Sequence, residues 1–268
     1  MLVARCSEFP SGGIWRAASL RMLSILKSWR DRGYQNIYGT DTIEQWCGRY
    51  VNKDSRPISV LDVGCGNGRD LLAARRAIGP ASQVNLYGIE CTPELIKGAQ
   101  AHGVQTFQVD LECSTLPFGD AFFDLVMANQ VLEHLKNWIW AFHELARVTK
   151  PGGTIILGVP NLAAFHNRLL ILIGRQPTCI RANGPHVRGF THHEFRRLGA
   201  SAAGLQVLNV GGTIVYGFPP NLGRRLGKTF PSLSATILLA LRKTAPNADV
   251  LSLLGADAQF ETNFYVGK

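Results

Sequence analysis

The sequence lacks several patterns that would point to particular classes of protein. No run approaches the roughly 20 apolar residues that a membrane-spanning helix needs, so the sequence predicts no such helix. The six cysteines include no C-x-x-C pair and no metal-ligand clustering, which is typical of scattered reduced thiols in a cytosolic protein. There is no H-E-x-x-H motif and no His/Cys ligand spacing, and the sequence therefore predicts no metal site.

Acidic residues are scarce and unevenly placed. The 268 residues include 28 Lys and Arg against 19 Asp and Glu, a formal net charge of +9. From residue 161 onward there are 12 basic residues and 4 acidic ones. This basic half favours an anionic partner, such as a phosphorylated or acidic small molecule, an anionic membrane surface or a nucleic acid. A solvated basic surface that maintains solubility is the alternative. Aromatic–basic interleaving of the RNA-binding kind is absent, which disfavours nucleic acid.

The sequence is most informative at its first glycine-rich turn. An apolar run over 58–63 ends at Gly64, Gly66 and Gly68, and a helix-like segment follows at once. The pattern predicts a buried parallel strand, a tight turn and the start of a helix. Glycine lets the backbone turn sharply and lets a ligand touch the main chain. Asp62 precedes the turn, where its charge would repel a pyrophosphate and attract an ammonium or sulfonium group.

Three later apolar runs also end in polar residues. The runs cover 84–89, 104–109 and 122–128, and the residues that follow them are Glu90, Asp110 with Leu111, and Asn129 with Gln130. A lone acid after a strand is usually a helix cap or a solvated loop residue. Open α/β sheets bind ligands outside the carboxyl ends of their parallel strands, and four such positions in succession therefore predict a binding site at this edge.

These segments resemble class I S-adenosylmethionine-dependent methyltransferases. The turn from Asp62 to Gly68 is similar to their motif I. Glu133-His134 and the Pro-Gly-Gly turn at 151–153 resemble the ubiquinone/menaquinone-type group (methyltransferase type 11), and Pro160-Asn161 with the segments that follow is similar to MetW-like proteins. The resemblance covers about residues 58–212.

The resemblance implies S-adenosyl-L-methionine as the cofactor. Glu90 would accept hydrogen bonds from both ribose hydroxyls, Asp110 would bond the adenine amino group, and the backbone amide of Leu111 would meet a ring nitrogen. Cys65 is expected to be a small residue in the loop and not a nucleophile. The implied cofactor-binding residues are Asp62, Gly64, Cys65, Gly66, Gly68, Glu90, Asp110, Leu111, Asn129 and Gln130.

Methyl transfer from a sulfonium is an in-line displacement that depends mainly on positioning, although an O- or N-acceptor also needs a nearby base. His134, beside Glu133, is the first candidate for that base, and the two are the candidate catalytic residues. The alternative is that His134 orients the loop. The other histidines considered are His166 and His186, which would face the substrate, and His192 and His193, expected at the surface.

The alternation of elements predicts an α/β fold, a Rossmann-like seven-stranded methyltransferase sheet with helices on both faces. The resemblance implies the strand order 3-2-1-4-5-7-6 with the last strand antiparallel. Strands are expected at 58–63, 84–89, 104–109, 122–128, 154–159, 205–211 and 260–266, and helices at 40–51, 69–78, 92–101, 137–148 and 191–200. Thr40 or Asp41 would cap the first helix with Glu44 at capping-box distance, and Thr191 would cap the last with Glu194.

Residues 1–50 are predicted to be an N-terminal helical extension, and 51–268 the methyltransferase domain with insertions at about 161–190 and 213–258. Two segments combine apolar and basic residues. Residues 14–30 would form an interfacial membrane helix, a transit-like segment or a helix packed on the core, and a true start at Met22 is a further alternative. Residues 222–243 would form a surface-lying helix on anionic lipid or a lid over the active site.

The sequence thus predicts S-adenosylmethionine-dependent methyl transfer to a small-molecule or lipid-linked, anionic acceptor, with the acceptor atom open. The alternatives are a nucleic-acid methyltransferase and a non-catalytic MetW-like partner or regulator. A nicotinamide-dependent oxidoreductase is disfavoured by Asp62 and by the G-x-G-x-G spacing. The expected location is the cytoplasm, with peripheral contact at the inner face of a membrane as an option.

Overall fold

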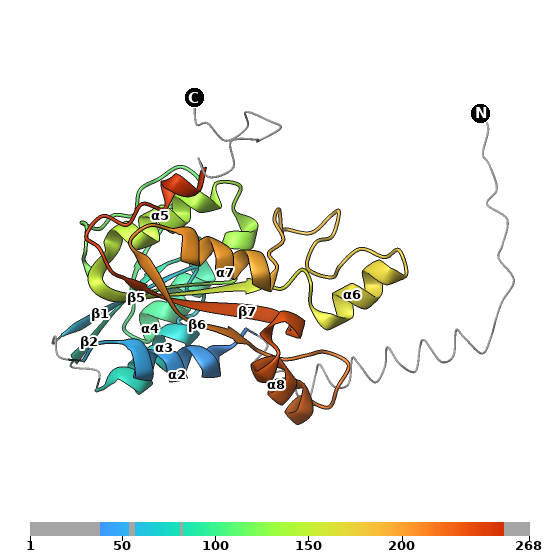
Figure 1. Cartoon of the computed structure of the whole chain (residues 1–268). Coiled ribbons are helices and arrows are strands. Elements are labelled where there is room, and N and C mark those ends of the chain that lie inside the picture. The colour runs from blue at the N-terminus through green and yellow to red at the C-terminus, as the bar shows by residue number, and fades with distance from the viewer. Residues whose placement is uncertain (1–37, 54–56, 81–82, 255–268) are drawn as a thin grey trace, which may run out of the picture. The chain divides into compact units, whose positions relative to one another are not determined.

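The computed structural model describes residues 38–53, 57–80 and 83–254. These residues form an α/β fold around one seven-stranded sheet (Figure 1). The strands are β1 (Ile58–Val63), β2 (Val84–Ile89), β3 (Gln105–Phe107), β4 (Phe123–Asn129), β5 (Thr149–Pro160), β6 (Leu205–Gly212) and β7 (Thr236–Lys243). The helices are α2 (Thr40–Tyr50), α3 (Arg69–Ile78), α4 (Pro93–Ala101), α5 (Trp138–Val148), α6 (Phe165–Leu172), α7 (His192–Ser201) and α8 (Pro220–Thr229).

The sheet has the order β3-β2-β1-β4-β5-β7-β6, which confirms the predicted topology. Strands β1 to β5 are parallel, and β7 runs antiparallel between β5 and β6. The central strands are continuous apolar runs because helices cover both faces of a parallel sheet. In β1, for example, Val60 and Leu61 point to opposite faces and are both fully buried.

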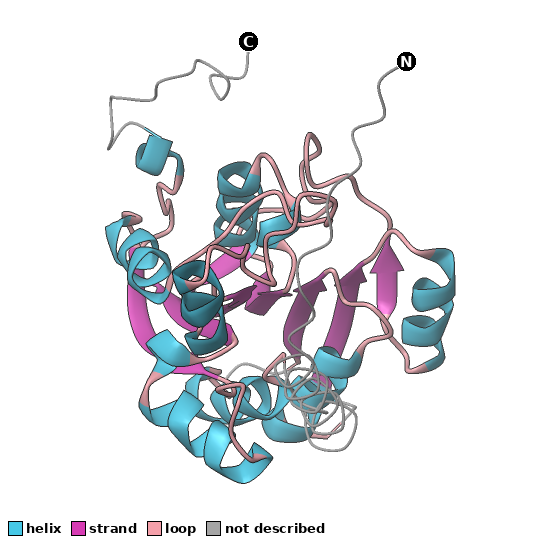
Figure 2. Ribbon diagram, turned by 90° about the vertical axis from the view of Figure 1, so that its right-hand side faces the viewer, coloured by secondary structure: helices cyan, strands magenta, loops and turns pink. Residues whose placement is uncertain are grey.

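Two hydrophobic clusters hold the helices to the sheet. Helices α2 and α3 pack on one face through side chains such as Trp46 and Leu71. Helices α5 and α7 pack on the other face through side chains such as Phe142 and Phe195. Figures 1 and 2 show the resulting three layers, with the sheet between two sets of helices. The carboxyl ends of the parallel strands are left for the loops that build the site.

The last strand of the sheet is not where the sequence predicts it. The predicted strand at 260–266 lies outside the described residues, as does the segment 14–30. Residues 236–243, expected to lie in a surface helix or lid, instead form β7, whose residues Ile237 to Leu241 are at most 1% exposed. The prediction of a surface-lying element is therefore wrong for this stretch, and the connection between β6 and β7 covers only residues 213–235.

The basic pair that closes β7 is also internal. The buried Nζ of Lys243 donates to the carbonyls of Ala146 and Thr149, each at 2.8 Å, at the end of α5. Arg242 donates to the carbonyls of Gly152 and Tyr50. These two charges satisfy backbone acceptors and are not available to an anionic surface.

The two predicted helix caps differ. Thr191 caps α7, its hydroxyl accepting from the amide of Glu194 at 3.3 Å. The cap predicted for α2 is wrong, because Gly39 precedes the helix in the left-handed region (φ 82°) and no side chain caps it. Glu44 instead pairs with Arg76 of α3 at 2.8 Å, which ties α2 to α3. No helix in the described ranges has the length and apolar character to cross a bilayer.

Candidate active site

A cavity of about 360 Å³ opens at the carboxyl ends of β1 and β4, within the range of about 300–1,000 Å³ typical of ligand pockets. Eight of the residues predicted to form the site line this cavity: Asp62, Gly64, Cys65, Gly66, Asn129, Gln130, Glu133 and His134. His186, from the insertion after β5, lines it as well. Four residues that the sequence does not predict also line the cavity: Tyr38, Asn67, Arg69 and Asp70. The predicted residues Gly68, Glu90, Asp110 and Leu111 do not.

The glycine turn forms one wall of the cavity. The amides of Gly64 and Cys65 both donate to the carbonyl of Ile89, so the loop is fixed to the end of β2. Gly66 has a positive φ of 56°, and a Cβ placed on it would have no atom within 4 Å. The main chain at Gly66 is therefore open to a ligand. Gly68 has a different role, because it begins α3 and packs closely on Val104 and Ala99.

Cys65 is held inside this loop as a small buried residue. Burial, with the nearby charges of Asp62 and Glu90, raises the pKa of its thiol to about 12. The Cys65 sulfur packs against Gly88 of β2, where a Cβ would lie only 2.5 Å from it. A residue with a side chain at position 88 would therefore clash with Cys65. The thiol therefore stays protonated and is packed against β2, which does not fit a nucleophile.

Asp62 is the buried acid of the cavity. It is 3% exposed, and its Oδ1 has no hydrogen-bond partner among the described residues. Burial and the neighbouring carboxylate of Asp70 raise its pKa well above the usual range, while Arg69 opposes the rise. An unpaired buried oxygen is costly unless a ligand satisfies it, and a cationic donor would do so best.

A second buried acid, Asp70, also lines the cavity and fixes the residues around it. Its Oδ1 accepts from the hydroxyl of Thr40 at 2.6 Å, and its Oδ2 accepts from the amide group of Asn129 at 2.8 Å. These contacts join α2, α3 and the end of β4. The sequence could have indicated Asp70, because it is an acid in the first turn of α3, directly after the glycine turn. Gln130, next to Asn129, has a positive φ of 62°, and its buried Nε2 has no hydrogen-bond partner within the described ranges.

Glu90 follows β2 and acts on the same loop from outside the cavity lining. Its Oε2 accepts from the amide of Gly66 at 3.0 Å, and its Oε1 accepts from the amides of Cys91 and Thr92 at 2.8 and 2.9 Å. Asp110, beyond β3, accepts from the amide of Glu112 at 2.9 Å, and Leu111 packs at the margin of the core. These residues lie along the same sheet edge as the cavity.

Glu133 is the most deeply buried ionisable group facing the cavity from the loop after β4. It is 1% exposed, and neither carboxylate oxygen has a hydrogen-bond partner in the described part of the chain. Burial raises its pKa to about 7, although a backbone hydrogen bond opposes part of the rise. Its backbone carbonyl accepts from the amides of Val187 and Arg188, which holds the insertion against this loop.

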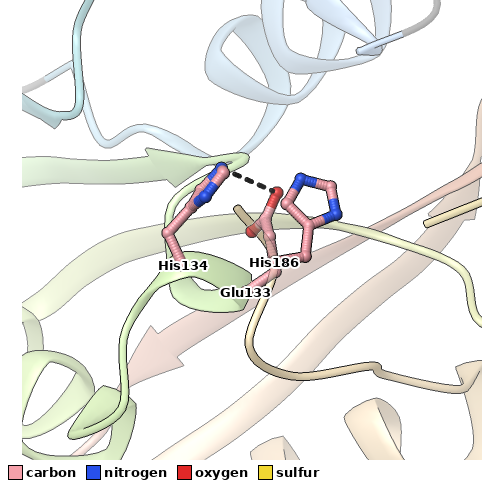
Figure 3. Close-up of side chains that lie close together, drawn as sticks. All are labelled: Glu133, His134 and His186. Carbon is pink, nitrogen blue, oxygen red and sulfur yellow. Dashed lines mark ion pairs between the residues drawn. The ribbon is translucent and has the colours of Figure 1, made fainter. Parts of the chain in front are cut away.

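Two imidazoles converge on that carboxylate (Figure 3). The Nε2 of His134 lies 4.0 Å from Oε1 of Glu133, and the ring centroids of His134 and His186 are 4.6 Å apart. The Nδ1 of His134 is 3.3 Å from the carbonyl of Pro185, and the Nδ1 of His186 is 2.6 Å from that of Cys179. Burial and the neighbouring His186 lower the pKa of His134, which is therefore neutral near pH 7.

The other histidines considered do not line the cavity. His166 bonds the hydroxyl of Thr178 at 2.9 Å, and burial lowers its pKa to about 4. His192 and His193 lie in the first turn of α7, where His193 is exposed. The site thus combines an open glycine turn, a buried acid with one oxygen unpaired among the described residues, and a carboxyl–imidazole cluster that can accept or hold a proton.

Comparison with known proteins gives a family match that spans most of the fold. The family model described as "Methyltransferase domain" matches residues 28–210. A demethylmenaquinone methyltransferase from Staphylococcus aureus is 31% identical over 127 residues, which cover 45% of this chain and 52% of that protein. The bifunctional methionine biosynthesis protein MetXA/MetW from Rhodopirellula baltica is 35% identical over 109 residues, covering 39% of this chain and 17% of that protein.

Solved structures share the fold. An S-adenosylmethionine-dependent methyltransferase from Thermotoga maritima superposes with a TM-score of 0.51 at 18% identity, covering 83% of this chain and 96% of that one. This likeness concerns the fold alone. The chain spans about half the length or less of the curated relatives named above.

Proposed function

Because this chain belongs to the methyltransferase-domain family, we propose that it transfers the methyl group of S-adenosylmethionine to a small-molecule or lipid-linked acceptor. The family match agrees with the sequence resemblance to class I methyltransferases. Bound S-adenosylmethionine would supply an activated methyl group on a sulfonium, and the protein would supply position and proton transfer. The acceptor atom is left open by this proposal.

The observation that carries the proposal is the pairing of two features in one cavity. Among the residues that the structure describes, none fills the space where a Cβ of Gly66 would project, and none bonds the buried Oδ1 of Asp62. A ligand that packs on the main chain and carries a positive amino group satisfies both. S-adenosylmethionine has such an amino group, whereas a dinucleotide would bring its pyrophosphate toward the carboxylate of Asp62.

Different residues of the cavity would bind the cofactor and act on the acceptor. Asp62 and the turn at Gly64 and Gly66 would hold the amino-acid end of the cofactor, while Glu90 fixes the turn from behind. Glu133 and His134 line the cavity from the loop after β4, where an acceptor would approach. The neutral imidazole of His134 would take the proton of an O- or N-acceptor, which is the role the sequence predicts for it.

An acceptor with an anionic and an apolar part fits the composition of the chain segment that supplies His186 to the cavity. Residues 161–235, which leave out the internal Arg242 and Lys243, contain nine Lys and Arg and one acid, Glu194. The same region exposes the apolar end of α6, where Leu172 and Ile173 are 80% and 67% exposed. Exposed apolar residues within a basic region favour a lipid-linked acceptor at an anionic membrane surface over a nucleic acid.

Two experiments test the proposal. Calorimetry should show that S-adenosylmethionine binds, that NADH does not, and that Asp62→Asn weakens binding while the surface variant Glu94→Ala leaves it unchanged. Incubation with methyl-labelled cofactor should then transfer label into a lipid extract more than into RNA. Cofactor binding without label transfer to any extract would favour a non-catalytic, MetW-like role. NADH binding without S-adenosylmethionine binding would overturn the proposal.

A variant of His134 tests the role of the loop after β4. Replacing His134 by Ala should lower turnover more than it lowers cofactor affinity, because the imidazole belongs to the loop after β4 and not to the glycine turn that would hold the cofactor. A His134→Ala protein with wild-type kcat on its acceptor would reduce His134 to a structural role.

A further inference from the structure

We propose that Glu133, His134 and His186 form a binding site for one divalent transition-metal ion. One oxygen or nitrogen from each of the three side chains lies within 4.8 Å of the others. Figure 3 shows the carboxylate and both rings pointing toward one space. Two imidazoles and one carboxylate, with an open side toward the cavity, are a donor set that zinc, iron(II) and manganese use in proteins.

The carboxylate gives the first independent argument. Glu133 is 99% withdrawn from solvent, and both its oxygens lack a hydrogen-bond partner in the described residues. A buried carboxyl group with no partner costs free energy, and native proteins rarely keep one without a bound ion or a functional role. A cation held between Glu133 and the rings removes that cost.

The rings give the second argument. A backbone carbonyl can only accept, so the carbonyls of Pro185 and Cys179 place the proton of each neutral ring on Nδ1. The Nε2 atoms of His134 and His186 then carry the free lone pairs. Metal-binding histidines show this arrangement, in which the second ring nitrogen donates to a carbonyl or carboxylate and fixes the orientation of the ring.

The distances require only a small adjustment. Ligand atoms about 2.1 Å from a tetrahedral ion are roughly 3.4 Å apart, whereas Nε2 of His134 is 4.0 Å from Oε1 of Glu133 and all three ligand atoms lie within 4.8 Å of one another. Side-chain rotation closes such a gap without moving the backbone. Sequence spacing predicted no metal because His186 comes from the insertion, more than 50 residues beyond His134.

The site stands on its own geometry, while the use of the metal rests on the proposed methyltransferase function. A metal ion here would be a Lewis acid beside the acceptor and would lower the pKa of an acceptor hydroxyl, which then loses its proton to water. His134 would in that case be a ligand and no longer the base. The two roles of His134 predict different responses to chelation.

The test uses the full chain after chelation and dialysis, with zinc chloride and cobalt(II) chloride as probes. Calorimetry and elemental analysis should give one zinc per chain, and cobalt should produce visible absorption bands of a low-coordinate site. Glu133→Gln and His186→Ala should each weaken zinc binding by at least about tenfold, since even outer-shell partners of metal ligands cost 10–100-fold. The matched control His193→Ala replaces an exposed histidine outside the cavity and should bind zinc as the wild type does.

S-adenosylhomocysteine binding separates this inference from the proposed function. If Glu133→Gln still binds S-adenosylhomocysteine, the variant is folded and its loss of zinc reports the site. Absence of stoichiometric zinc and cobalt binding to the wild type, or zinc binding that Glu133→Gln and His186→Ala leave unchanged, overturns the metal site. Zinc binding without any methyl transfer would leave the metal site standing and count against the methyltransferase proposal.

Discussion

Replacing Glu90 by alanine tests how the cofactor end of the cavity is held. The carboxylate accepts from three backbone amides, those of Gly66, Cys91 and Thr92. In the alanine variant, water can replace the carboxylate at the exposed amides of Cys91 and Thr92. The bond to the Gly66 amide is partly buried, and it ties the glycine turn to the end of β2. Loss of this bond should cost about 1 kcal/mol of stability, a fall of roughly 2–4 °C in Tm for a domain of this size.

The effect on cofactor binding should be larger. If Glu90 also accepts from the ribose hydroxyls, alanine removes about 1–3 kcal/mol of binding free energy, or about 5–150-fold in Kd. Glu90→Gln should weaken cofactor binding about as much as Glu90→Ala. The NH2 group of glutamine is a donor, and it would face either the Gly66 amide or the amides of Cys91 and Thr92, which are donors themselves.

Isothermal titration with S-adenosylhomocysteine measures Kd, and Glu94→Ala, which removes an exposed acid in the next helix, is the control for charge. A Glu90→Ala protein with wild-type Kd would show that the carboxylate positions neither the ligand nor the turn, and the reasoning would fail.

Three further predictions concern the turn, the core and a buried histidine. Gly66→Arg should abolish cofactor binding in calorimetry, because its side chain fills the open space and its φ of 56° disfavours any residue but glycine; measurable affinity would contradict this. Lys243→Met should lower stability by about 2–3 kcal/mol, seen as a fall of roughly 4–12 °C in Tm, because the carbonyls at the end of α5 lose their donor. For His166, whose folded pKa is about 4 against about 6.5 unfolded, stability is present above pH 6.5 and is lost as the pH falls toward 4. Denaturation at pH 7.5 and 5 should show about 2 kcal/mol more loss in the wild type than in His166→Gln, and equal losses would refute the shift.

Much of the fold follows from local pattern and the family resemblance together. Strands β1 and β2 and helix α3 have the bounds that the sequence predicts, because each is an uninterrupted run ended by glycine or an acid. Strand β7 was missed because a short apolar run does not distinguish a buried strand from a helix. The flanking Arg242 and Lys243 suggested a surface, yet their partners are carbonyls far away in the sequence.

The site was predictable where its residues lie at strand ends or in a segment with family resemblance, and unpredictable where they come from elsewhere. Asp62 and Asn129 lie at the ends of β1 and β4, while Glu133 was predicted from the resemblance of Glu133-His134 to the methyltransferase group. The convergence of His186 on Glu133 depends on how the insertion folds back, which its backbone bonds to the Glu133 carbonyl determine. No spacing rule in the sequence encodes that contact.

The position of β7 between β5 and β6 has a consequence for synthesis of the chain. Strand β6 is made before β7, yet in the described sheet its only neighbour is β7. During translation the five parallel strands can assemble first, while β6 waits as an unpaired strand until residues 236–243 leave the ribosome. Its open edge is then a template for wrong pairing, so a ribosome pause after β6 has emerged from the exit tunnel and before residues 236–243 have done so should raise aggregation of the nascent chain.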